Sequence, residues 1–210
     1  VSAAGCLGAG SLLLAFTRRY RRELEPRDGP LLVVLGWLVM SVAAAVPLEL
    51  EIPGLTLTHA FFEAVAGLTT TGATVLTGLE YLPQSVNIWR HAMQWYGGMG
   101  IIVMAVAILP MLGVGGMQMF KAEAFETGEK LLPRAAQISA ALSLIYAGLT
   151  LLCAIALYLA GMNWLDASVH AMTSVATGGF SNRDASIGAF ASAQIDVILT
   201  LGMLAGSLPF

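Results

Sequence analysis

Two short strips of the sequence carry residue types that could bind a cation without any charged group. Both follow the pattern threonine, any residue, glycine, any residue, hydroxyl residue. Glycine allows backbone conformations that turn successive carbonyl groups toward a common axis, and carbonyl oxygens can replace the hydration shell of an ion. Hard divalent ions usually need carboxylates, which the strips lack, so the pattern favours a large monovalent cation. The residues of the strips are Thr70, Thr71, Gly72, Ala73 and Thr74, and Thr177, Gly178, Gly179, Phe180 and Ser181.

The two strips belong to an internal repeat with an offset of 107 residues. The same offset pairs Ala60 with Ala167 farther upstream. Each strip closes a short apolar stretch, 59–79 or 166–181, that is too broken to cross a bilayer. Small residues also occur where membrane helices pack closely, which is the alternative interpretation of a single strip. Two copies in the same context favour an ion site.

Membrane helices are the predicted elements that position the strips. Hydrophobic residues make up 57% of the 210 residues and charged residues 11%, against about 25% charged residues in soluble domains. This composition excludes a soluble globular domain. The apolar runs should be helices, because lipid offers no partner to unpaired backbone groups. The predicted spanning segments, of which the first and last are incomplete, are 1–17, 29–48, 91–120, 135–165 and 197–210.

A short helix is predicted before each strip, and both helices enter the membrane without crossing it. Each would direct its C-terminal, partly negative end toward the ion, and Thr58 and Asp166 are the predicted caps at the opposite ends. Glu63 and His170 occupy equivalent positions in the two short helices. They are predicted to brace the strips from behind. The alternatives for Glu63 are an attractor for cations and an ordinary helix side chain in contact with water.

Lysine and arginine are unevenly distributed, and this predicts the orientation. Eight of the ten lie within residues 18–27 and 121–134, whereas Arg90 and Arg183 lie on the other side. Basic loops stay in the cytoplasm, so Arg18–Arg27 and Lys121–Arg134 are predicted to be cytoplasmic and the short helices to enter from outside. Arg90 and Arg183 would then flank the outer entrance, where they either tune the local cation concentration or reach lipid head groups.

Glycines are concentrated in two of the predicted spanning segments. Gly97, Gly98 and Gly100 lie in one segment, and Gly202 and Gly206 form a small-residue pair in the last. Close helix packing is the predicted reason in both cases. A gating hinge is the alternative for the first group.

Other classes of function find little support in the sequence. A net charge of −3 and an isoelectric point near 5.5 give no basic surface for nucleic acid. His59, His91 and His170 lack the spacing of zinc ligands. The spanning segments contain no HExxH motif and no pair of aspartates, so an intramembrane enzyme is unfavoured. A purely structural membrane subunit is a further alternative.

The sequence resembles the Trk/Ktr/HKT superfamily of potassium transporters, and within it the bacterial TrkH/TrkG type. The resemblance covers nearly the whole chain. The segments that carry it are Phe61–Val75, Ile88–Met104, Glu129–Thr150 and Gly161–Gly188.

The resemblance implies an all-α polytopic membrane protein built like a potassium channel. In this family four helix–pore-loop–helix units surround one pore, and one central glycine per unit sets the selectivity filter. Gly72 and Gly179 match these glycines, and the preceding filter positions match Thr70, Thr71, Thr177 and Gly178. The other strip residues flank the filter. Two of the four units are expected here, as the N-terminal part of a longer chain.

The expected organisation has four parts. Residues 1–28 would be the end of an N-terminal helical hairpin with its basic loop, 29–120 the first unit, 121–134 a cytoplasmic linker and 135–210 the second unit. The resemblance also implies a bacterial inner-membrane location, the two remaining units of the chain, a homodimer and a cytoplasmic nucleotide-binding regulatory subunit like TrkA. Potassium would be the transported ligand, with no cofactor and no transition metal.

The predicted function is potassium uptake through a carbonyl-lined selectivity filter, with no chemical step. A sodium-selective or sodium-coupled transporter of the same superfamily is the main alternative. A serine in place of the first filter glycine is associated with sodium in this family, and position 72 is glycine.

Overall fold

The computed structural model describes residues 10–11, 15–17, 28–104 and 131–208. Within these ranges the chain is helical and contains no β-strand. The predictions for residues 1–9, 12–14, 18–27 and 105–130 lie outside the described residues. They include the basic loop at 18–27 and most of the predicted linker 121–134. Residues 131–134 belong instead to a helix that begins at Leu131.

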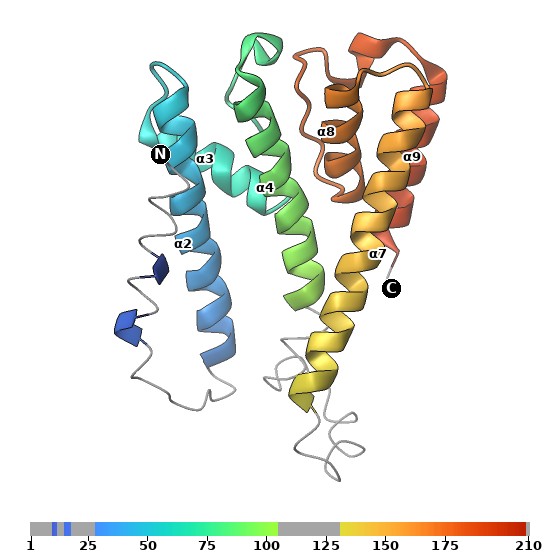
Figure 1. Ribbon diagram of the computed structural model, residues 1–210. Helices are drawn as coiled ribbons and strands as arrows, with labels where there is room; N and C mark the ends of the chain where they lie inside the picture. The colour runs from blue at the N-terminus through green and yellow to red at the C-terminus, as the bar shows by residue number, and fades with distance from the viewer. Residues whose placement is uncertain (1–9, 12–14, 18–27, 105–130, 209–210) are drawn as a thin grey trace.

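The first half of the molecule contains two long helices with a short one between them. Helix α2 (Asp28–Glu51) is followed by α3 (Leu57–Leu68), then by the first strip and the 3-10 helix η1 (Leu79–Tyr81), and finally by α4 (Gln84–Val103). Helix α2 runs up the molecule and α4 runs down it, while α3 lies in the upper half (Figure 1).

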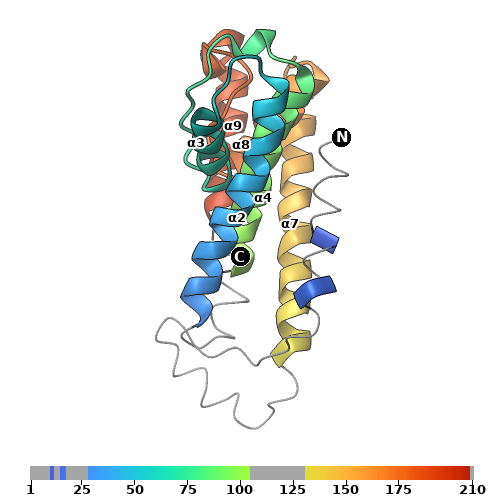
Figure 2. The same cartoon turned by 90° about the vertical axis from the view of Figure 1, so that its left-hand side faces the viewer.

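The second half repeats this order. Helix α7 (Leu131–Leu159) is followed by α8 (Trp164–Val175), then by the second strip and η3 (Ser186–Phe190), and finally by α9 (Ala193–Ser207). Helix α7 runs in the direction of α2, and α8 occupies the upper half like α3 (Figures 1 and 2). The two halves therefore have the same orientation, as the repeat predicts.

Two of the described helices are long and apolar enough to cross a membrane. The qualifying segments are Leu31–Glu51 in α2 and Gln137–Leu159 in α7. Large apolar side chains such as Leu31, Val39 and Leu151 are more than half exposed, which suits contact with lipid. Helix α9 is apolar but shorter. The spanning segment predicted at 91–120 begins earlier in the structure, because its helix, α4, starts at Gln84.

The helix caps differ from those predicted. Helix α3 is capped by Thr56, whose hydroxyl accepts from the backbone N–H of His59, and α8 is capped by Asn163, which accepts from that of Asp166. Thr58 and Asp166 lie inside the first turns instead. Asp166 is thereby freed to bind a later segment of the chain.

Glycines let the second long helix of each half approach the end of the short helix. A Cβ atom on Gly97 of α4 would lie 2.0 Å from the carbonyl oxygen of Leu68, and one on Gly206 of α9 would lie 2.1 Å from that of Val175. Leu68 and Val175 are the last residues of α3 and α8. The predicted packing role of these glycines is confirmed, and the same contact occurs in both halves.

Candidate functional site

Each strip begins at the C-terminus of a short helix, and the two helix ends have the same hydrogen bonds. At the end of α3 the N–H groups of Thr70 and Thr71 donate to the carbonyls of Gly67 and Ala66, at 2.9 and 3.0 Å. The equivalent bonds at the end of α8 are Thr177 to Ser174 and Gly178 to Thr173, at 3.0 and 2.8 Å. This pair of bonds is a Schellman motif. The 107-residue repeat is therefore present in the hydrogen bonding as well as in the sequence.

The backbone of the strips adopts positive φ at alternate positions. Thr70 and Gly72 have φ values of 55° and 75°, and Thr177 and Gly179 have values of 52° and 83°. Threonine is branched at Cβ and rarely adopts such values, and strained backbones of this kind cluster at functional sites. Alternating the sign of φ prevents successive carbonyls from pointing to opposite sides, as they do in a β-strand.

Among the residues that the structure describes, none pairs with the carbonyl oxygens of the six predicted filter residues. No described residue donates a hydrogen bond to any of them. The helix ends accept from the N–H groups of Thr70, Thr71, Gly72, Thr177 and Gly178, so these residues offer mainly acceptors. Carbonyls without a protein donor need water or an ion as a partner. The residues concerned are Thr70, Thr71, Gly72, Thr177, Gly178 and Gly179.

The two strips lie side by side although they come from different halves. A Cβ atom on Gly72 would lie 2.0 Å from the carbonyl oxygen of Gly178. Gly179 differs, because a Cβ atom there would meet nothing within 4 Å. The second strip runs between α4 and α8 (Figure 1). The two predicted central glycines are thus not equivalent in their surroundings.

Gln94 of α4 is buried between the strips and was not predicted. Its Oε1 accepts from the hydroxyl of Thr173 and, at 3.2 Å, from the N–H of Phe180. A Cβ atom on Gly178 would lie 2.5 Å from Gln94, so the absence of a side chain at 178 lets the amide in. The Nε2 atom of Gln94 has no partner among the described residues.

Glu63 and His170 contact equivalent hydroxyl groups. The hydroxyl of Thr74 donates to Glu63 at 2.8 Å, and the hydroxyl of Ser181 lies 3.1 Å from Nε2 of His170. The Nδ1 of His170 lies 2.8 Å from the carbonyl of Asp166 and therefore carries the proton, which leaves Nε2 as the acceptor. Glu63 is fully buried, so the alternative of a carboxylate in contact with water is wrong.

Arg90 does not lie exposed at the outer entrance, where both alternatives of the sequence analysis placed it. Its side chain is fully buried and forms an ion pair of 2.7 Å with Glu63. It also donates to the carbonyl of Ser181 at 3.1 Å. Arg183 pairs with Asp166 at 2.6 Å and is 37% exposed. Neither arginine is therefore a free charge at the outer entrance.

The sequence does contain a signal for this polar face of α4. Asn87, Arg90, His91 and Gln94 recur at helical spacing and are all buried. Residues three and four apart share a helix face, so four polar residues in this pattern within an apolar chain indicate a face directed into the protein.

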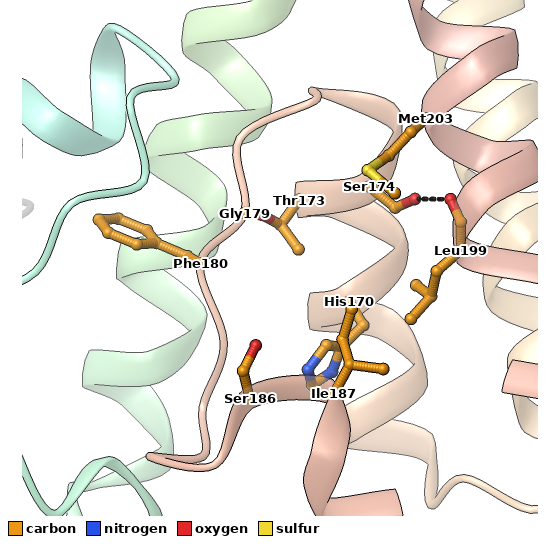
Figure 3. Close-up of a pocket in the computed structure, with 9 residues that line it drawn as sticks. All are labelled: His170, Thr173, Ser174, Gly179, Phe180, Ser186, Ile187, Leu199 and Met203. Atoms are coloured by element: carbon orange, nitrogen blue, oxygen red, sulfur yellow. Dashed lines mark hydrogen bonds between the residues drawn. The ribbon is translucent and has the colours of Figure 1, made fainter. Parts of the chain in front are cut away.

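A small pocket lies behind the second strip. It is bounded by α8, η3 and α9, and Figure 3 shows Phe180 pointing away from α8 while the hydroxyl of Ser174 donates to the carbonyl of Leu199. No group of three or more metal-ligating side chains occurs in the described ranges. The lining residues are His170, Thr173, Ser174, Gly179, Phe180, Ser186, Ile187, Leu199 and Met203.

Comparison with known proteins decides the family. The model of the TrkH family, described as "Cation transport protein", matches residues 3–210. The chain belongs to the TrkH family. Members of this family are transport proteins and not enzymes, as predicted.

Curated relatives support this assignment. The chain is 48% identical over its whole length to the Trk system potassium uptake protein TrkI of Halomonas elongata, and 49% identical over 94% of its length to TrkH of Escherichia coli K12. TrkG of the same E. coli strain is 38% identical over 92% of the chain. The matches cover 43%, 42% and 40% of these relatives. The chain therefore spans about two fifths of the length of the relatives it matches.

Proposed function

We propose that this TrkH-family chain takes part in potassium uptake across a membrane and that its two strips bind the dehydrated ion. The observation that carries the proposal is the set of six strip carbonyls without donors, supplied by two helix ends of the same geometry. The C-terminal ends of α3 and α8 add partial negative charge at this place. The relatives are named potassium uptake proteins.

Neutral oxygens suit the transport of a monovalent cation. A carboxylate in the strips would hold a cation tightly, whereas carbonyls can exchange with hydration water and release the ion on the far side. Glu63, the carboxylate that contacts Thr74 of the first strip, is neutralised by Arg90. Uptake then requires no catalytic group, and the concentration difference or the membrane voltage drives the ion.

Two strips form only part of a ring around an ion. We propose that two further helix–pore-loop–helix units of the same polypeptide complete the ring, and that Ala73, Thr74, Phe180 and Ser181 flank the filter. The proposed orientation in the bacterial inner membrane has the strips opening outward and the basic loops in the cytoplasm. A homodimer and a nucleotide-binding regulatory subunit are the proposed protein partners.

Substitution of the central glycines tests the proposal. Gly72→Ser should reduce the preference for potassium over sodium about tenfold or more, since the new Cβ atom meets Gly178 and positive φ disfavours a side chain. Gly179→Ser should have a smaller effect, because only φ opposes it. The measurement is tracer uptake by potassium-starved cells that express the natural polypeptide carrying this chain, with sodium as competitor.

The control is Gly148→Ser, at a position on α7 with open space around it. This variant should retain wild-type uptake and selectivity. Unchanged selectivity in both the Gly72 and Gly179 variants would remove the strips from the ion path. Uptake driven by sodium, or of sodium in preference to potassium, would instead support the sodium-transporting alternative.

A further inference from the structure

One arginine connects the two halves of the molecule directly behind the strips. Arg90 of α4 is fully buried, and its Nε and Nη2 atoms both lie 2.7 Å from Oε1 of Glu63 in α3. Nη2 also donates to the hydroxyl of Thr74 at 3.2 Å, and Nη1 donates to the carbonyl of Ser181 at 3.1 Å. A single guanidinium group thus contacts the first short helix, the first strip and the second strip.

The aromatic ring of the second strip is held by the same group. The Cζ atom of Arg90 lies 4.4 Å from the centre of the Phe180 ring, which is within the range of a cation–π interaction. Gln94, one helical turn farther along α4, accepts from the N–H of Phe180. Helix α4 of the first half therefore holds the second strip at two successive residues.

The second half contains no counterpart to this arginine. The repeat offset gives Val197 of α9 as the equivalent of Arg90, and the two-position shift of the helix contacts gives Leu199; both are apolar. Glu63 corresponds to His170, which contacts Ser181. The other described ion pair, Asp166–Arg183, lies within the second half. A purely local brace would be expected in both halves, whereas Arg90 occurs once and reaches both strips.

A contribution to stability alone does not account for a buried ion pair. Desolvation of two charges offsets most of their attraction, and a well-packed apolar pair of similar volume is often as stable or more stable. The planar guanidinium fork does provide fixed geometry, because its nitrogen atoms point in set directions. The role of Arg90 that this geometry favours is to place the groups that it contacts.

We propose that Arg90, oriented by Glu63, is a positioning residue that sets the second strip relative to the first and thereby sets ion selectivity. This inference rests on the proposed function of the strips. Selectivity between ions of different size depends on the spacing and orientation of the oxygens around them. A connection through one rigid group keeps the carbonyl of Ser181 at a constant distance from Thr74.

The decisive variant removes both charges together. Glu63→Leu combined with Arg90→Met leaves no unpaired buried charge, so the protein should still fold and insert. Arg90→Lys is the second variant, since it keeps the charge but loses the fork. The control is Trp89→Phe, which removes the hydrogen bond from Trp89 to the carbonyl of Ala44 on α2, away from the strips. All variants are made in the natural polypeptide that carries this chain.

The measurement is the ratio of potassium to sodium uptake, normalised to the amount of protein in the membrane. We expect this ratio to fall about tenfold in the double variant and in Arg90→Lys, and to remain at the wild-type value in Trp89→Phe. A double variant with wild-type selectivity would overturn the proposal. Its absence from the membrane would also overturn it, because the pair would then serve folding.

The Gly72→Ser variant separates this inference from the proposed function. If Gly72→Ser loses selectivity while the double variant keeps it, the strips bind the ion and only the role of Arg90 is wrong. If Gly72→Ser also keeps wild-type selectivity, the proposed function of the strips fails first.

Discussion

At the scale of single residues, the threonine that follows each short helix is held in an unfavourable backbone conformation. Glycine usually occupies this position of a Schellman motif, because positive φ brings the Cβ of other residues close to the backbone. Here the position is Thr70 in one half and Thr177 in the other. The strain amounts to about 1–2 kcal/mol per residue, and the same strain in both halves indicates that the side chain has a use beyond folding.

Replacement of Thr177 by glycine should therefore stabilise the protein. Thr177 is exposed, so Thr177→Gly mainly relieves the positive φ, and we expect a gain of about 1 kcal/mol. The measurement is thermal unfolding of the purified protein in detergent. Thr200→Gly is the matched control, since Thr200 is an exposed threonine within α9, where glycine should cost about 0.5 kcal/mol relative to threonine. A loss of stability in both variants would show that Thr177 is not strained.

At the scale of elements, the short helices are placed by backbone contact with the long ones. Gly97 and Gly206 allow α4 and α9 to touch the last carbonyls of α3 and α8. Val175 follows Leu68 by the repeat offset, whereas Gly206 lies two residues beyond the position that the same offset gives for Gly97. Both halves therefore make the same helix contact, but the glycine that allows it lies at a different repeat position in each half.

Alanine at either glycine should separate the elements. In a helix, alanine is ordinarily favoured over glycine by about 1 kcal/mol. Gly97→Ala and Gly206→Ala should instead destabilise the protein by about 1–3 kcal/mol, because the new methyl group overlaps a backbone oxygen that cannot move aside. Thermal unfolding shows whether each variant is more or less stable than the wild type. Gly148→Ala, with open space around it, is the control and should not destabilise; equal effects at all three positions would contradict the contact.

At the scale of the whole molecule, the two halves are also joined through the loops above the strips. The carboxylate of Asp184 accepts from the N–H groups of Gly78 and Leu79, at 2.7 and 2.9 Å. In return, Glu80 accepts from the N–H of Asp184 at 3.1 Å. Together with Arg90 behind the strips, this connection holds the halves at two levels.

The loop connection predicts a loss of stability in acid. The hydrogen bonds from Leu79 and Gly78 lower the pKa of Asp184 below its ordinary value. A carboxylate with a lowered pKa contributes stability that is fully present above about pH 3.9 and is lost as the pH falls through the lowered value. Thermal unfolding of wild type and Asp184→Asn should show a smaller acid-induced decrease in the variant. Parallel curves down to about pH 3 would contradict this role.

Much of the fold follows from local features of the sequence. The apolar composition, the two short helices and the same order of elements in both halves were all predictable, because each depends on runs of residue types over one or two turns. The strips were recognisable through their repeated threonine–glycine pattern at a constant offset. Their ion-binding role stays a prediction, supported by the free carbonyls.

The short helices and strips of the two halves are encoded locally in the chain, whereas the contacts between the halves arise only when it folds. Arg90 was expected at the outer entrance, where it would either tune the local cation concentration or reach lipid head groups. Its burial depends on Glu63 and Ser181, which lie 27 and 91 residues away in the chain. Such a contact is stable only when the ion pair and the hydrogen bonds together offset the cost of desolvating the charges. The groups that provide them are far apart in the chain, so no local pattern predicts the contact.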